Sequence, residues 1–298
     1  MKYIYKPKKK HKLIFIVQTT IKLADLSATI NHKGAELISL KKNTTEYIWE
    51  GNPEFWGKHS PVLFPIVGTL KNNSYQFNNT AYSLSRHGFA REMQFDLIEQ
   101  KENSATFSVT SSTETLKTYP FDFELHITYS LQDNGIDIQY NVINRGKSKM
   151  PFSIGAHPAF ALTANFEDYS LEFEKEEILE YHLLEDGLIS DKTIKHRLQN
   201  KSIPLTYQLF ENDALVFKKT ESKALTILEN QNPILRVRFE DFPNLGIWTV
   251  ANAPFICIEP WCGYSDTTNS SGDLFAKEGI QVLNPNENFQ PKFSIEIL

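Results

Sequence analysis

The chain has 298 residues, 41% of them hydrophobic and 12% aromatic, which is enough to bury a large core and fold as a globular protein. Its formal net charge of −5, with acidic residues scattered along the chain, argues against a nucleic-acid-binding protein. The only cysteines, Cys257 and Cys262, are too few for a disulfide framework, so we expect the protein to reside in the reducing cytoplasm. A small neutral or polar ligand fits this composition best.

Residues 1–20 are predicted to be an extension that precedes the folded domain. Lysines concentrate in residues 1–12, and an apolar run follows at residues 13–17. This run is too short for a membrane-spanning helix, which needs about 20 apolar residues, and no small-residue cleavage pattern follows it. We therefore expect an extension with an edge strand, no export signal and no membrane partner, and a single domain over residues 21–298.

The first part of this domain is predicted to be a hairpin followed by an aromatic loop. Residues 21–30 and 35–40 alternate weakly on either side of a turn, which indicates two paired strands. Residues 47–64 carry tryptophan and phenylalanine among glycines and prolines, as is typical of a loop that lines a site. His87 follows between two arginines, where a core position is unexpected; it is either a surface residue or a site residue.

The clearest periodicity in the chain lies at residues 121–142. Apolar and polar residues alternate on both sides of a tight turn at residues 133–135, which predicts a long hairpin. His182 and His196 lie in a charged stretch that is expected to be irregular, and we assign neither histidine a role. Shorter alternating runs recur at residues 106–109, 169–173, 235–239 and 292–298. No segment has a sustained 3.6-residue stripe, so we predict an all-β, large antiparallel sandwich.

Two polar residues at strand ends are candidates for a site. His157 follows an apolar strand, is preceded by Gly155 and is followed by Pro158, so small neighbours leave room for a ligand. A histidine that is hydrogen-bonded within a turn would show the same pattern. Asp213 lies just before another apolar strand, where a turn-forming aspartate is the ordinary explanation.

Glu259 is the residue around which the chain is organised. Residues 255–258 form an unbroken apolar run, typical of a strand buried on both faces, and Pro260 cannot extend a central ladder, so Glu259 is expected at a strand end. Strand alternation places Phe255, Cys257 and Glu259 on one face, so the carboxylate points toward a core or a cleft. Such a carboxylate is either satisfied structurally or is a functional base.

The motifs that the chain lacks narrow the chemistry further. It contains no H-E-x-x-H, no paired cysteines and no glycine-rich phosphate loop. The sequence therefore predicts no metal and no cofactor, and it leaves general acid and base catalysis. Aromatic side chains suit the apolar faces of sugar rings, and neutral polar side chains suit their hydroxyls.

Four segments, at residues 63–71, 86–91, 155–160 and 245–266, resemble in order the aldose 1-epimerase (galactose mutarotase) family, and most closely its LacX-like branch. The resemblance covers residues 21–298. It implies a galactose mutarotase-like β-sandwich whose concave sheet holds an aldose. It also implies a cofactor-independent isomerase that acts on a small sugar.

The resemblance assigns roles to individual residues. It implies that His157 is the catalytic acid and that Glu259 is the catalytic base. It implies substrate-binding roles for His87 and, through a looser match, for Asp213, with Trp261 beside the base as an aromatic contact. In this mechanism Glu259 removes the proton of the anomeric hydroxyl while His157 protonates the ring oxygen.

One position departs from the family pattern. The family commonly has a Gly-Arg pair where this chain reads Gly68-Thr69, so the sugar-binding arginine is missing. Lys71 and Arg91 are the candidates to supply its charge. An ammonium group, however, does not reproduce the planar fork of a guanidinium.

Three other functions remain open. A hexose-6-phosphate 1-epimerase would need a basic pocket, for which Lys71, Arg86 and Arg91 are the candidates. A catalytically silent sugar-binding module is consistent with the missing arginine. A glycosidase would use Glu259 with Asp213.

The acid and base pair also predicts a bell-shaped pH profile. Burial is expected to raise the pKa of Glu259, which would set the acidic limb. The nearby carboxylate is expected to hold the imidazole of His157 charged, so that its pKa would set the alkaline limb.

Overall fold

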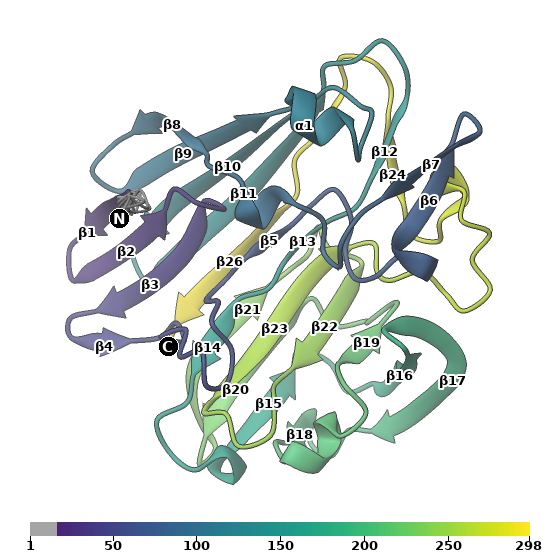
Figure 1. The fold of residues 1–298 in the computed structure, drawn as a ribbon. Helices are drawn as coiled ribbons and strands as arrows, with labels where there is room; N and C mark the ends of the chain where they lie inside the picture. Colours follow the sequence, from purple (N-terminus) through teal and green to yellow (C-terminus); the bar gives the residue numbers. More distant parts are fainter. Residues whose placement is uncertain (1–16) are drawn as a thin grey trace, which may run out of the picture.

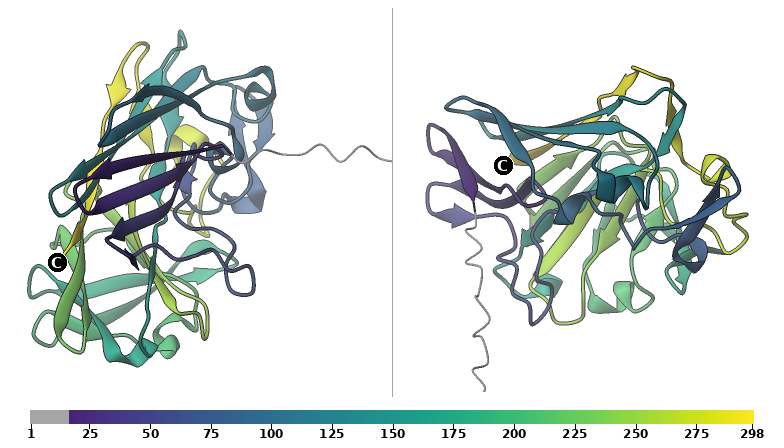
Figure 2. Two further views of the ribbon diagram at one scale, coloured as in Figure 1. Left: turned by 90° about the vertical axis from the view of Figure 1, so that its left-hand side faces the viewer. Right: turned by 45° about the horizontal axis from the view of Figure 1, so that its top comes forward.

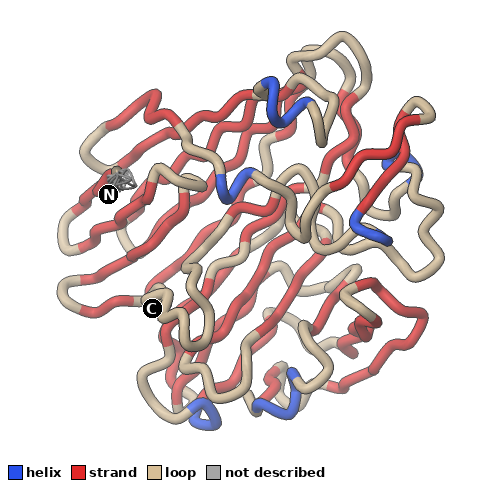
Figure 3. Tube along the Cα trace, in the orientation of Figure 1, coloured by secondary structure: helices blue, strands red, loops and turns tan. Residues whose placement is uncertain are grey.

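The computed structural model describes residues 17–298 and is built almost entirely of strands (Figures 1 and 3). Every pair of named strands is antiparallel, which confirms the predicted all-β class. The helical turns are short: α1 (Thr113–Leu116) and the 3₁₀ turns η1 (Lys71–Asn73), η2 (Ala90–Glu92), η3 (Phe166–Asp168), η4 (Tyr207–Phe210) and η5 (Leu274–Ala276). Within the described part, no helix is long and apolar enough to cross a membrane.

Two large sheets carry most of the chain. The ten-stranded sheet has the order β18 (Ser202–Pro204), β15 (Tyr169–Phe173), β20 (Ala224–Glu229), β21 (Asn232–Arg238), β26 (Lys292–Ile297), β11 (Gly135–Asn144), β10 (Phe123–Gln132), β9 (Ser104–Thr110) and β8 (Asp96–Gln100), with β25 (Asn288–Phe289) also on β11. The eight-stranded sheet has the order β17 (Leu188–Arg197), β16 (Ile178–Glu185), β19 (Leu215–Phe217), β22 (Asn244–Trp248), β23 (Phe255–Cys262), β13 (Ile154–Ala156) and β5 (Val62–Leu63), with β14 (Ala159–Ala161) also on β23.

Three smaller sheets complete the fold, and the views in Figure 2 show the N-terminal one beside β8–β10. They are β1 (Gln18–Leu23), β2 (Leu26–Asn31), β3 (Glu36–Lys42) and β4 (Thr45–Glu46); β6 (Ser74–Phe77) with β7 (Thr80–Ser83); and β12 (Met150–Phe152) with β24 (Gln281–Leu283). The hydroxyl of Tyr129 on β10 donates to the carbonyl of Ala35 over 2.7 Å, which joins the N-terminal sheet to the ten-stranded one.

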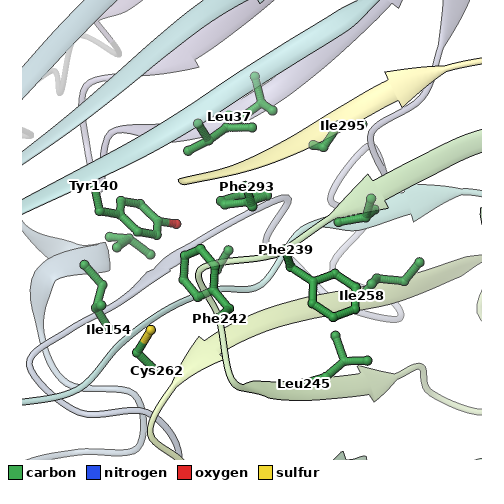
Figure 4. Close-up of a cluster of buried hydrophobic side chains, with 14 of the residues drawn as sticks. Leu37, Tyr140, Ile154, Phe239, Phe242, Leu245, Ile258, Cys262, Phe293 and Ile295 are labelled. Atoms are coloured by element: carbon green, nitrogen blue, oxygen red, sulfur yellow. The ribbon is translucent and has the colours of Figure 1, made fainter. Parts of the chain in front are cut away.

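The core lies between the two large sheets (Figure 4). Tyr140 and Phe293 come from the ten-stranded sheet, and Leu245 and Ile258 come from the eight-stranded sheet. Phe242 packs between them, with its ring centroid 6.3 Å from that of Tyr140. Each such side chain contributes about 1.5–3 kcal/mol on full burial, so this layer holds the two sheets face to face.

The long hairpin predicted at residues 121–142 is confirmed. It consists of β10 and β11, and Gln132 pairs with Gly135 across the tight turn. Along β10 every second residue from Phe123 to Leu131 is buried, as the alternation predicted. Periodicity was sufficient here because one face of these strands packs on the core.

Two predictions of local structure were wrong, one at residues 21–30 and one at residues 182–196. Residues 21–30 are not one strand, because the chain turns between β1 and β2, where Ala24 adopts a positive φ of 50°. Alanine is not a turn signal, so Asp25 was the only turn-forming residue in this turn. The edge strand expected at the end of the extension is β1, which begins at Gln18, and residues 1–16 lie outside the described part.

The charged stretch at residues 182–196 is also regular, contrary to expectation. It belongs to the hairpin of β16 and β17 at the edge of the eight-stranded sheet. Most residues of β17 are exposed, so the hairpin has few apolar positions to show a period.

Candidate active site

The two faces of β23 have different neighbours. Ile256 and Ile258 point into the core between the large sheets. Glu259 and Trp261 line a cavity of about 270 Å³ on the opposite face of the eight-stranded sheet. This volume lies just below the roughly 300–1,000 Å³ of sites for drug-sized ligands, so it suits a ligand of monosaccharide size. The alternation predicted for this strand is confirmed.

We had expected Glu259 at the end of its strand, but it lies within β23. β22 pairs with β23 as far as Pro260 and beyond. On the other edge the partner changes from β14, opposite Cys257, to β13, opposite Trp261. Pro260 lies opposite the gap between these partners, so the strand tolerates a residue without an N–H.

His157 fills the gap between β13 and β14. Its Nε2 lies 3.3 Å from Oε2 of Glu259. The ring stacks on Trp56, with centroids 4.7 Å apart, and meets Trp248 edge-on at 5.6 Å. These aromatic contacts hold the imidazole in place, because Nδ1 of His157 and Oε2 of Glu259 are both buried without a hydrogen-bond partner among residues 17–298.

Burial controls the protonation of this pair. It raises the pKa of Glu259 well above its ordinary value, against the opposing charge of Arg86. It lowers the pKa of His157 to about 3, and the charge of Arg86 adds to the effect. The imidazole is therefore not held charged, so our expectation for its pKa was wrong. Burial therefore disfavours the charged form of both groups.

His87 is buried beside this pair, with its ring centroid 5.7 Å from that of His157. The backbone N–H of Gly68 faces its Nδ1 over 3.1 Å, and Nε–H of Arg86 faces its Nε2 over 3.2 Å; a neutral imidazole accepts at only one of these nitrogens. Burial lowers the pKa of His87 well below its ordinary value, and His157 and two arginines add to this. His87 also has a positive φ of 68°, and such backbone strain concentrates at functional sites.

Arg86 and Asp213 form the charged wall of the cavity. Nη1 of Arg86 lies 3.8 Å from Oδ2 of Asp213, and its Nε lies 3.2 Å from Nε2 of His87. Asp213 has a positive φ of 74°, and its Oδ1 accepts from the N–H of Ala214. Arg91 also lines the cavity and donates to the carbonyl of Arg86.

Trp261 lies across two neighbouring strands at the cavity. A Cβ added to Gly155 on β13 would lie 2.5 Å from its indole, and one added to Gly246 on β22 would lie 2.6 Å from it. Both positions therefore require glycine for the ring to lie flat on the sheet. The indole N–H donates to the carbonyl of Ala156, which fixes its orientation.

Of the seven predicted site residues, only Lys71 is not at the cavity. Its Nζ donates to the carbonyl of Thr268 over 2.7 Å. Thr69, which replaces the family arginine, lies beneath the β16–β17 turn, where a Cβ on Gly187 would be 3.2 Å from its Oγ1. Two guanidinium groups line the cavity: that of Arg91, a predicted replacement, and that of Arg86, a residue that we had considered only for phosphate.

Sequence reasoning missed several further cavity residues, among them Trp56, Trp248 and Ser265, and the apolar residues Leu184, Ile189 and Val216. Trp56 belongs to the aromatic loop, so its composition was a usable signal. Trp248 is the last residue of β22, Ser265 follows β23, and neither position carries a pattern of its own. These residues meet only because the loops fold over the same face of the sheet.

The fold and the site together define a large β-sandwich with a buried acid–base pair in a small, aromatic-lined cavity. The Aldose 1-epimerase family model matches residues 17–296. Chromosomal Protein LacX of Lactococcus lactis subsp. lactis is 36% identical over 297 residues, covering 94% of this chain and 99% of its own. The chain therefore belongs to the aldose 1-epimerase family.

Solved structures agree with this assignment. A galactose mutarotase related enzyme from Lactobacillus acidophilus is 33% identical with a TM-score of 0.90, covering 95% of this chain and 97% of its own. A galactose mutarotase-like protein from Lactobacillus casei is 31% identical with a TM-score of 0.88, covering 95% and 100%. A galactose 1-epimerase from Lactobacillus acidophilus shares the fold, with a TM-score of 0.71, 16% identity and coverage of 99% and 97%.

Proposed function

We propose that this protein is an aldose 1-epimerase that interconverts the α and β anomers of a monosaccharide. The observation that carries the proposal is the 3.3 Å separation of His157 Nε2 and Glu259 Oε2 at the cavity. The two oxygens that exchange protons in this reaction, O1 and the ring oxygen, are bonded to the same carbon. An acid and a base that serve them have to lie within a few ångströms of each other.

The proposed reaction needs only one proton on the pair. Transfer of that proton from Glu259 to His157 creates the base and the acid. Glu259 then takes the proton of the anomeric hydroxyl while His157 protonates the ring oxygen, the C1–O5 bond breaks and a C1=O bond forms. Rotation about C1–C2 and the reverse transfers close the ring as the other anomer, so protons balance and no cofactor is consumed.

Three tryptophans support a sugar as the ligand. Trp56, Trp248 and Trp261 line the cavity and offer apolar faces to the C–H face of a pyranose. Around them, the imidazole of His87, the fork of Arg86 and the carboxylate of Asp213 provide donors and acceptors for hydroxyl groups. We propose that Arg86 takes the binding role for which the family arginine is missing at Thr69.

A hexose 6-phosphate is the second candidate substrate. Arg86 and Arg91 both line the cavity, and Nε of Arg91 is buried without a partner among the described residues. A guanidinium with a free N–H suits a phosphate oxygen. Lys71 does not add positive charge to this site, because its ammonium group donates a hydrogen bond to the carbonyl of Thr268 outside the cavity.

The experiment is polarimetry on freshly dissolved α anomers, both free hexoses and their 6-phosphates, with His157→Asn as the matched control. We expect the protein to accelerate the approach to anomeric equilibrium, and the control to lose this acceleration. Acceleration with the phosphorylated sugars alone would select the second candidate. A protein that binds these sugars without accelerating the change would be the silent binding module.

Compartment and partners remain part of the proposal. Cys257 and Cys262 are both free and buried, which is consistent with the reducing cytoplasm that we expect. The small sugar is the only partner that we propose.

A further inference from the structure

Cys257 is a buried nucleophilic group that the proposed mechanism does not use. It lies two residues before Glu259 on the same face of β23 and is fully buried. Donor atoms of His157, Cys257 and Glu259 all lie within 4.8 Å of one another. The three residues show no metal-binding spacing in the sequence, so only the pairing of β14 with β23 brings them together.

The separations match a tetrahedral zinc site. Zinc binds imidazole nitrogen and carboxylate oxygen at about 2.0–2.1 Å, so two such ligands of one tetrahedral ion lie about 3.3 Å apart. Nε2 of His157 and Oε2 of Glu259 are separated by 3.3 Å. With a Zn–S bond of about 2.3 Å the sulfur belongs about 3.6 Å from the other two donors, so Cys257 has to approach by no more than about 1.2 Å.

The surroundings also suit a dication with an open fourth position. Glu259 is 1% exposed, His157 is 7% exposed, and Oε2 of Glu259, a proposed ligand atom, lacks a hydrogen-bond partner within residues 17–298. A thiolate and a carboxylate neutralise a dication, so Arg86 faces a site without net charge. Coordination sends the thiol proton of Cys257 and the carboxyl proton of Glu259 to the buffer, and no electrons are transferred.

We propose that His157, Cys257 and Glu259 form a binding site for a thiophilic divalent cation, with zinc as the best fit, and that the bound cation blocks the sugar. Binding of the cation stands independently of the proposed function, whereas inhibition rests on it. Zinc would occupy the acid and the base together. The metal and the sugar therefore exclude each other.

Binding is tested first, on the reduced, chelator-stripped full chain. Zn²⁺ is titrated by calorimetry, and Cd²⁺ is titrated by its ultraviolet thiolate charge-transfer band. Cys257→Ala is compared with Cys262→Ala, because Cys262 is equally buried but packs in the core on the other face of β23. We expect Cys257→Ala to lose the cadmium band and at least about 10-fold in zinc affinity, and Cys262→Ala to keep both.

Several results would overturn the site. They are an absence of zinc binding to the wild-type chain, a cadmium band that survives in Cys257→Ala, and zinc affinity that is unchanged in that variant. Zinc that binds at surface histidines would give the unchanged affinity in Cys257→Ala. Circular dichroism of both variants confirms that each is folded before it is titrated.

Inhibition is tested second, by polarimetry with and without Zn²⁺. We expect zinc to raise KM without changing kcat, EDTA to reverse this, and Cys257→Ala to need at least about 10-fold more zinc for the same effect. Inhibition that is noncompetitive or equal in Cys257→Ala contradicts the exclusion of sugar by metal. A metal-free protein without epimerase activity refutes the proposed function alone, because the cadmium band still reports the site.

Discussion

Two buried acid–base pairs in this protein differ in how their polar atoms are satisfied. In the pair of Lys277 and Asp266, Nζ lies 3.1 Å from Oδ1 and also donates to the carbonyl of Tyr264, while Oδ2 accepts from the N–H of Lys71. In the pair of His157 and Glu259, one atom of each residue has no partner in the described part of the chain. The buried polar atoms of the first pair have hydrogen-bond partners, whereas the second pair has atoms available to a ligand.

The difference separates a pair with a structural role from the pair to which we assign catalysis. The N–H of Asp266 also donates to the carbonyl of Thr69, so Asp266 joins the Ser265 loop to the segment that contains Gly68, and both line the cavity. Burial lowers the pKa of Lys277, and the charge of Asp266 opposes the shift. In the second pair burial raises the pKa of Glu259 and lowers that of His157, so it disfavours the charged form of both groups.

The largest expected effect is on the second pair. Glu259→Gln keeps the shape of the side chain but cannot accept a proton, so we expect kcat to fall by about 10² to 10⁴ without loss of stability. Polarimetry measures the rate, and thermal unfolding measures the stability. Turnover close to that of the wild type would remove Glu259 from the mechanism.

The first pair should respond in stability. Lys277→Met leaves Asp266 as an unpaired buried charge, so we expect the free energy of unfolding to fall by about 3–5 kcal/mol. Urea denaturation measures this. The double variant Lys277→Met/Asp266→Asn removes the orphaned charge and should recover part of the loss. A single variant as stable as the wild type would show that the pair does not hold the loop.

Substrate binding should be affected less than either pair. Arg86→Gln removes charged hydrogen bonds worth about 1.5–3 kcal/mol, so we expect KM to rise by about 10-fold to 100-fold with a smaller change in kcat. Lys71→Gln is the matched control, because Lys71 lies outside the cavity, and its KM should stay unchanged. If the two variants exchanged these results, Lys71 would be the residue that replaces the family arginine.

The smallest effect is a shift of the pH profile. The pair gains a second proton when pH falls through the lowered pKa of His157, and it loses its only proton when pH rises through the raised pKa of Glu259. The positive charge of Arg86 lowers the pKa of both groups. Arg86→Gln should therefore move both limbs of kcat/KM to higher pH. Limbs that stay in place, or move to lower pH, would contradict this assignment of the protons.

Periodicity in the sequence was sufficient wherever a strand packs one face on the core. The β10–β11 hairpin and the two faces of β23 were predicted because alternation is a local property that every second residue repeats. The same rule failed for the β16–β17 hairpin, most of whose outer strand is in solvent. It also missed the turn at Ala24, where an alanine adopts a positive φ and Asp25 is the only turn-forming residue.

For the site, the sequence by itself determined the types of residue available: a carboxylate on an apolar strand, histidines beside small residues, and aromatic loops. Only the tertiary structure decided which of them meet. It placed Glu259 within a strand whose partner changes beside it, brought Arg86 to the cavity and Lys71 away from it, and set Cys257 beside the pair. The reason is physical, because residue patterns report the environment of one strand, whereas contacts between distant segments depend on strand pairing and loop paths.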